Sequence, residues 1–93
     1  MREKEIEMKL VRAVKSIGGI CPKWVSPGFD GVPDRVILLP GARIAFAELK
    51  APGKTPRPVQ AVRIRQLRDL GFQVYVFDCP EQIGGVLNEV SAS

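Results

Sequence analysis

Two apolar runs separated by a short turn constrain the fold of this chain more than any other feature. The runs are 36–39 and 44–47, and Pro40-Gly41-Ala42 lies between them. Short runs rich in β-branched and aromatic residues on either side of a Pro/Gly turn predict a β-hairpin. Both faces of this hairpin are mostly apolar, which is typical of central strands covered on both sides. We therefore expect the hairpin to form the middle of a sheet.

The length of the turn decides which side chains meet across the hairpin. A three-residue turn places Val36 opposite Phe46, and it places Asp34 opposite Glu48. Opposed side chains on one face have Cβ atoms roughly 4.5–5.5 Å apart. Lys50 shares the face of Glu48, because residues two apart in a strand point the same way. Two carboxylates and an ammonium group should therefore converge at one end of the hairpin, whereas a two-residue turn would separate the carboxylates.

Such a cluster has two interpretations. Two carboxylates that lie close together repel unless a cation sits between them, and Mg²⁺ or Mn²⁺ is often held by carboxylates, water and phosphate oxygens. A neighbouring lysine can orient or deprotonate a water, or hold the scissile phosphate. The cluster then predicts phosphodiester hydrolysis. The alternative is a hairpin that ends in ordinary solvated charges.

Composition excludes several classes of function. Ninety-three residues are the size of one domain, so we expect a single domain over 1–93. No run approaches the length of a membrane span and the first residues do not form a signal peptide, so we expect a cytoplasmic protein with no membrane partner. The chain has no histidine and no CxxC pair, which excludes histidine-dependent nucleophiles and argues against a zinc site. A net charge of +4 favours a polyanion partner.

The remaining elements follow from apolar spacing and from the positions of glycine and proline. We expect helices at 3–17, 58–70 and 80–90, and strands at 20–25 and 72–78 in addition to the hairpin. The element order is then αβββαβα. The packed face of the second helix is predicted to carry Val59, Val62, Leu67 and Leu70, with Gln60 at the border of the core.

The first helix offers a third acidic group. Glu3 precedes Ile6 by three residues and Leu10 by seven, so it extends the apolar stripe of this helix toward the N-terminus. Glu7 sits beside it, and helix periodicity admits either residue. The functional interpretation aims this carboxylate at the hairpin site, and the alternative is a carboxylate that stabilises the helix N-terminus through the macrodipole.

These elements and the residues at their ends resemble the PD-(D/E)xK nuclease superfamily. The matching positions are Glu3, Gly31-Val32-Pro33-Asp34, Glu48-Leu49-Lys50 and Gln60. The closer likeness is to the virus-type replication-repair nuclease (VRR-NUC) family, in its single-domain phage or bacterial form, and it covers residues 3 to 78. A lone Pro-Asp or Glu-x-Lys is common, but the full set in this order is specific. The resemblance implies an α/β fold with a restriction-endonuclease-like core, in which helices flank a mixed central sheet.

The resemblance also implies metal-dependent cleavage of DNA. Asp34 and Glu48, with the backbone carbonyl of Leu49, would bind Mg²⁺ or Mn²⁺. Lys50 would position or activate the attacking water, and Gln60 would assist from the second helix. Glu3 matches the first-helix acid of the pattern.

The substrate implied is branched DNA. Single-domain members of the family resemble enzymes that act as homodimers on four-way (Holliday) junctions, in the cytosol of a phage or bacterial host. Alternatives are a flap or nicking nuclease and a non-catalytic DNA-binding subunit with a nuclease fold. We expect DNA contacts from five cations: Lys23, Arg35, Lys54, Arg57 and Arg63.

Overall fold

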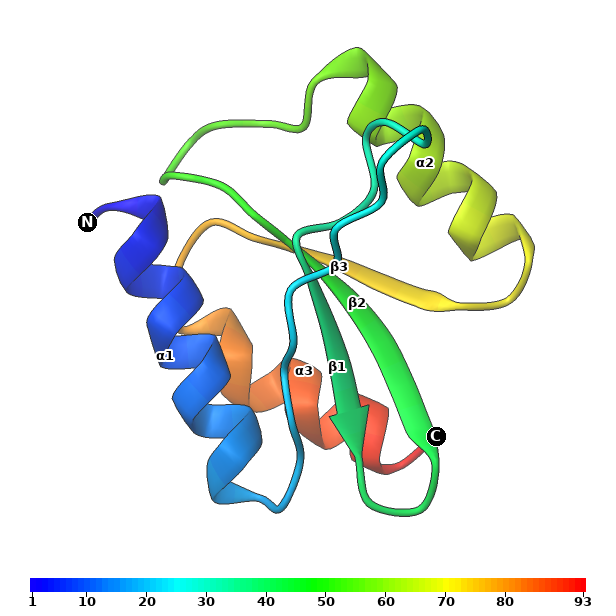
Figure 1. Cartoon of the computed structure of the whole chain (residues 1–93). Helices are drawn as coiled ribbons and strands as arrows, with labels where there is room; N and C mark the ends of the chain where they lie inside the picture. Colours follow the sequence, from blue (N-terminus) through cyan, green and yellow to red (C-terminus); the bar gives the residue numbers. More distant parts are fainter.

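The chain folds into three helices around a small mixed sheet (Figure 1). A computed structural model describes all residues, 1–93. The elements in order are α1 (Glu3–Ser16), β1 (Arg35–Leu39), β2 (Arg43–Leu49), α2 (Pro58–Asp69), β3 (Gln73–Phe77) and α3 (Gln82–Ser91). β2 is the central strand, antiparallel to β1 and parallel to β3. The predicted α/β class with a mixed sheet flanked by helices is confirmed.

The helices cover the two faces of the sheet unequally, with two helices on one face and one on the other. α1 and α3 pack on one face, where their apolar stripes meet Ala45, Ala47 and Leu49 of β2. α2 packs on the other face, where Ile64 meets Phe46, and Figure 1 shows α2 set apart from α1 and α3. Alternate residues of β2 therefore point into two different apolar clusters. No helix combines the length and the apolar character needed to cross a membrane.

The hairpin has the register predicted from a three-residue turn. Val36 pairs with Phe46 and Leu39 with Arg43, so Pro40, Gly41 and Ala42 alone connect the strands. Gly41 and Ala42 both have positive φ, 83° and 61°, and Ala42 is the one non-glycine residue of the chain in this region. The turn thus fixes which side chains of the two strands share a face.

The strand predicted at 20–25 is wrong, so the order observed is αββαβα. The segment runs antiparallel to β1 but forms only two isolated bridges, Ile20 with Leu38 and Lys23 with Arg35. Pro22 explains the interruption, because it has no N–H to donate and contributes only its carbonyl, which accepts from Val36 N at 2.9 Å. The segment covers the edge of β1 without becoming a regular fourth strand.

The packed face of α2 also differs from the prediction. Val62 and Leu70, expected in the core, are 51% and 74% exposed, whereas Gln60 and Ile64 are buried. Residues 60, 64 and 67 follow the spacing of one helix face, so α2 packs along that row. Gln60 was predicted at the border of the core and is buried on the packed face itself, so this face lies further round the helix than the apolar residues alone predict.

Candidate active site

The predicted cluster lies where β1 begins and β2 ends, on the face of the sheet that α2 covers. Glu48 is two residues from Phe46 in β2 and therefore points to the same face of the sheet. Lys50 follows directly after the strand. Lys50 Nζ lies 3.1 Å from Glu48 Oε2. The shared face predicted for these two side chains is therefore observed.

Asp34 is tied to the same end of β2 from the neighbouring strand. Its Oδ2 accepts a hydrogen bond of 2.9 Å from the backbone N–H of Leu49, between Glu48 and Lys50. This bond holds the Asp34 carboxylate beside β2, close enough for its charge to raise the pKa of Glu48. The structure thus brings Asp34, Glu48 and Lys50 together, as the hairpin register requires.

The carboxylate of Glu48 is buried without adequate partners. The residue is 1% exposed, and neither carboxylate oxygen accepts a hydrogen bond. The 3.1 Å approach of Lys50 is an ion pair by distance, but its geometry does not satisfy the oxygen as a hydrogen bond does. Burial raises the pKa of Glu48, the contact with Lys50 opposes this rise, and the negative charge of Asp34 adds to it. An unsatisfied buried charge destabilises a fold unless a ligand completes it.

The oxygen atoms at this site fit a hard divalent cation. No group of three or more His, Cys, Asp or Glu side chains converges in the structure, so a metal would receive two carboxylates from Asp34 and Glu48. Mg²⁺ is commonly held by one or two carboxylates, with water and substrate phosphate completing its coordination. The orphaned oxygens of Glu48 are what such an ion would satisfy, and the backbone carbonyl of Leu49 is a third oxygen at the same strand end.

Gln60 occupies the start of the helix that covers this face. Its side chain is 7% exposed, and its Oε1 accepts a hydrogen bond of 2.8 Å from the backbone N–H of Arg57. This contact caps the first turn of α2 and fixes the orientation of the amide. The amide nitrogen donates no hydrogen bond within the chain, so both of its N–H groups are free.

The acidic residues of α1 lie differently from the prediction. Glu3 is exposed, so its expected place on the buried stripe is wrong; the stripe consists of Ile6, Leu10 and Val14. Glu7 flanks that stripe and its Oε2 accepts a hydrogen bond of 2.8 Å from Arg35 Nε. Glu7, the other first-helix acid that helix periodicity admits, thus pairs with Arg35 on the α1 face of the sheet, because alternation along β1 sends Arg35 to that face.

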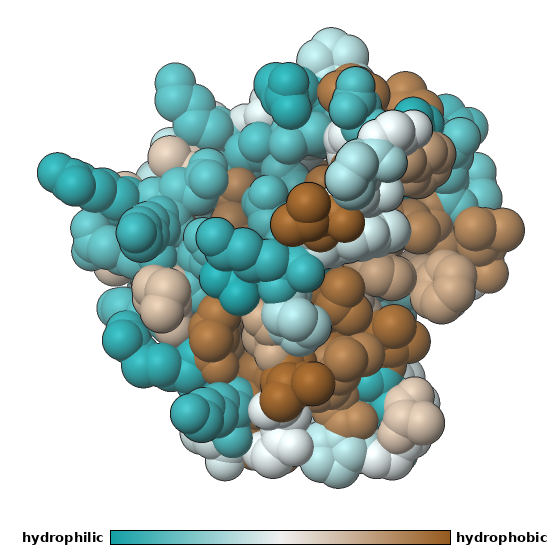
Figure 2. All heavy atoms as spheres, in the orientation of Figure 1, coloured by the Kyte–Doolittle hydropathy of each residue, from teal (hydrophilic) through white to brown (hydrophobic).

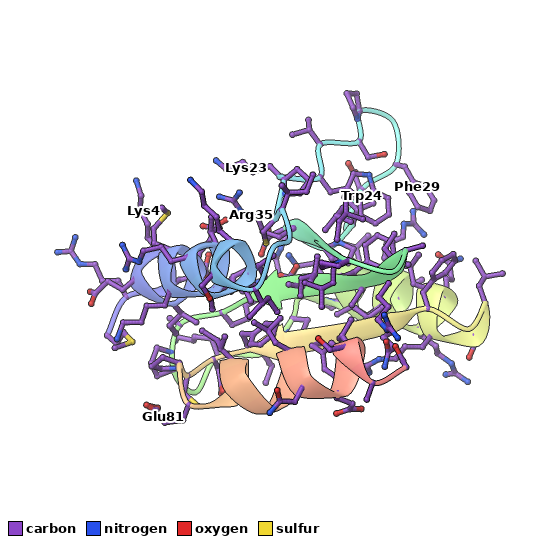
Figure 3. All side chains as sticks on the ribbon, turned by 90° about the horizontal axis from the view of Figure 1, so that it is seen from below. Lys4, Lys23, Trp24, Phe29, Arg35 and Glu81 are labelled. Carbon is purple, nitrogen blue, oxygen red and sulfur yellow. The ribbon has the colours of Figure 1, made fainter.

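Two of the five predicted DNA-binding cations are occupied by contacts within the chain. Arg35 also donates to the carbonyl of Cys21 at 2.9 Å, and its side chain is 13% exposed. Arg63 donates to the carbonyl of Asp30 at 2.7 Å. Lys23, Lys54 and Arg57 are exposed. Figure 3 shows Lys23 extending outward from its segment, with Arg35 beneath it beside α1.

Comparisons with known proteins found a relative by sequence and a solved structure with a similar fold. No protein-family model matches the sequence. The chain is 51% identical over 78 residues to a protein named "Putative nuclease p44" from Acyrthosiphon pisum secondary endosymbiont phage 1, and the alignment covers 84% of each chain. A solved structure described as "VRR_NUC domain" superimposes with a TM-score of 0.86 at 25% identity, over 92% of this chain and 94% of that one.

Proposed function

The chain belongs to the VRR-NUC family of nucleases, and from this premise we propose that it is a metal-dependent DNA endonuclease. One observation carries the proposal. The Glu48 carboxylate is buried beside Asp34 and accepts no hydrogen bond of good geometry, although the Lys50 ammonium lies 3.1 Å from its Oε2. A structural acid in that position would need partners, whereas a metal ligand leaves its oxygens free for the ion.

The roles of the acids follow from their positions. Asp34, Glu48 and the carbonyl of Leu49 would hold Mg²⁺ or Mn²⁺. When bound, the ion supplies Lewis-acid chemistry, which neutralises charge on the phosphoryl oxygens and lowers the pKa of a water. The bond from Leu49 N to Asp34 Oδ2 leaves the second oxygen of Asp34 free, so the acid is oriented and still able to bind.

In this proposal Lys50 and Gln60 would contact the water or the substrate, and the acids would hold the metal. The ammonium of Lys50 lies 3.1 Å from Glu48 Oε2, and from there it would orient the attacking water or contact the scissile phosphate. Gln60 offers its free amide N–H groups from α2, because its oxygen is already committed to Arg57 N. We retain Glu3 as the first-helix acid of this proposal, to be compared directly with Glu7.

The DNA backbone is contacted by cations outside the acidic cluster. Lys54 and Arg57 are exposed on the segment that connects Lys50 to α2, and Lys23 is exposed beside β1. Such contacts hold phosphates without reading the base sequence. We therefore propose that selectivity comes from the shape of branched DNA.

The test of catalysis compares DNA structures and metal ions. Purified protein is incubated with four-way junction, flap, single-stranded and linear duplex DNA, each with Mg²⁺, Mn²⁺ or EDTA. Asp34→Asn, Glu48→Gln and Lys50→Met should each abolish cutting, and Glu81→Gln, an exposed acid beside α3, should cut normally. Cutting in EDTA, or full activity in any of the three site variants, would refute the proposal. DNA binding by the wild type without cutting would favour the non-catalytic subunit.

We further propose that the enzyme is a homodimer acting on four-way junctions. Each chain has one candidate site, and a two-fold dimer presents two sites to two symmetry-related strands. Large apolar side chains remain exposed, including Ile20, Val25 and Leu70, and Figure 2 shows hydrophobic atoms gathered on the face turned to the viewer. Exposed apolar patches are typical of protein interfaces.

Sedimentation equilibrium tests the dimer, and a junction extruded from supercoiled plasmid tests coordinated cutting. A dimer should linearise the plasmid by paired cuts within one binding event. A monomer at micromolar concentration, or a preference for linear duplex, would leave a flap or nicking nuclease.

A further inference from the structure

The segment that leads into Asp34 is an irregular loop rather than a strand. It spans residues 25–33, with positive φ at Gly28 and Gly31. Its base is closed by one backbone hydrogen bond of 3.0 Å, from Trp24 N to the carbonyl of Asp34. Because Asp34 lies just before β1 begins, the loop and the strand both determine where its carboxylate lies.

Arg63 of α2 contacts the tip of this loop in two ways. Its Nε donates a hydrogen bond of 2.7 Å to the carbonyl of Asp30. Its guanidinium carbon lies 3.9 Å from the centroid of the Phe29 ring, a cation–π contact. Nη1 donates to Gln66 Oε1 at 3.0 Å, which orients the guanidinium from within its own helix. Two of its three nitrogens are thus engaged inside the protein.

Gly31 brings the loop against α2 at a second point. A Cβ at this position would lie 2.7 Å from the carbonyl oxygen of Val59, so only glycine allows this approach. From Gly31 the chain passes through Pro33, which is fully buried, directly to Asp34. The loop is therefore held by α2, the helix that also carries Gln60. Gln60 lies one turn before Arg63 in this helix.

We propose that Arg63 is a positioning residue that holds the loop 25–33 on α2 and so fixes Asp34 relative to Glu48 and Gln60. This inference rests on the proposed function. It replaces the phosphate contact predicted for Arg63 from its charge alone. The planar guanidinium of arginine can donate hydrogen bonds and stack on an aromatic ring at the same time. The ammonium of lysine cannot reproduce both contacts.

The test uses Arg63→Ala, Arg63→Lys and a control, Arg65→Ala. Arg65 is exposed on the same helix and makes no hydrogen bond or ion pair in the structure. Release of the loop should raise the rate of chymotrypsin cleavage after Phe29 about tenfold in both Arg63 variants, given the strength of the two lost contacts. The cleavage site is identified by mass spectrometry, and retention of the fold by thermal unfolding.

The metal site provides the second readout. Mn²⁺ binding to the protein alone, measured by electron paramagnetic resonance, should weaken in both Arg63 variants, and kcat should fall roughly 10- to 100-fold because the acid is misplaced. The Kd for DNA in EDTA and its salt dependence should stay unchanged. Arg65→Ala should match the wild type in kcat and Mn²⁺ binding.

Two results would overturn the inference. One is wild-type chymotrypsin resistance and Mn²⁺ affinity in both Arg63 variants. The other is normal behaviour of Arg63→Lys together with weaker, less salt-dependent DNA binding by Arg63→Ala, which is the behaviour of a phosphate contact. If Arg63→Ala does not fold, Arg63→Lys decides. A wild-type protein that binds no Mn²⁺ and cuts no DNA refutes the proposed function instead, and chymotrypsin still reports whether Arg63 holds the loop.

Discussion

Glu48→Gln should make the metal-free protein more stable while it abolishes cleavage. The wild-type carboxylate is 1% exposed, faces the charge of Asp34 and accepts no hydrogen bond. Glutamine has nearly the same shape, carries no charge, and can donate its amide N–H to the Asp34 carboxylate. The substitution therefore removes an unsatisfied buried charge without creating a cavity.

The magnitude follows from two opposing effects. An unsatisfied buried polar group costs about 1–3 kcal/mol, and more when it is charged. The lost ion pair with Lys50 offsets about 1 kcal/mol or less of that gain, because the Lys50 side chain keeps 15% exposure and water can solvate its unpaired ammonium. We expect a net gain of about 1 kcal/mol or more in the free energy of unfolding, which raises Tm by roughly 4–8 °C in a domain of this size.

Thermal unfolding in EDTA and in Mn²⁺ measures this effect. In EDTA, Glu48→Gln should melt above the wild type; added Mn²⁺ should raise the wild-type Tm by mass action and leave the variant nearly unchanged. The matched control is Glu81→Gln, whose exposed side chain should change stability by less than about 0.5 kcal/mol. A variant that melts below the wild type in EDTA would show that Glu48 stabilises the fold, and the argument for a metal ligand would fail.

Three further predictions concern the loop, the core thiol and α1. Gly31→Ala should destabilise the protein by at least about 1 kcal/mol more than Gly28→Ala in urea titrations: both have positive φ, but only at Gly31 does the added Cβ meet the backbone of α2. Burial raises the pKa of Cys21 from 9.0 to about 11. The folded state then holds this proton more tightly than the unfolded state, so stability should fall as pH rises from about 9 to about 11, and Cys21→Ala should flatten that slope. Glu3→Gln should lower the cleavage rate at least roughly tenfold, whereas Glu7→Gln should instead lose about 1 kcal/mol of stability with its bond to Arg35; cleavage lost in Glu7→Gln alone would move the first-helix acid to Glu7.

The hairpin was predictable because local rules determine it. A Pro/Gly turn of three residues and a period of two fix which residues pair, and that pairing by itself brings Asp34, Glu48 and Lys50 together. The same rules predict the helix bounds within one or two residues at most ends, since glycine and proline mark them.

Features that depend on packing between distant segments were not predictable in this way. Glu3 follows the apolar spacing of α1, but residues 1–5 are all exposed and the buried stripe begins only at Ile6. Arg63 looks like any surface cation until the loop folds over it and presents the carbonyl of Asp30. Helix periodicity predicts which side chains share a face of a helix. Whether that face is buried depends on a distant segment that packs against it.

Within the seven residues of β2, alternate side chains have two different roles, one in packing and one in the proposed chemistry. Ala45, Ala47 and Leu49 serve the core beneath α1 and α3, and the intervening Glu48 serves the proposed chemistry. Loss of the acid would leave the apolar core unchanged and remove a buried charge, so the prediction for Glu48→Gln implies that an inactive variant is more stable than the wild type. A single substitution at Glu48 would thus give a folded chain without the proposed activity, and recovery of that activity would require the acid to return against the predicted gain in stability.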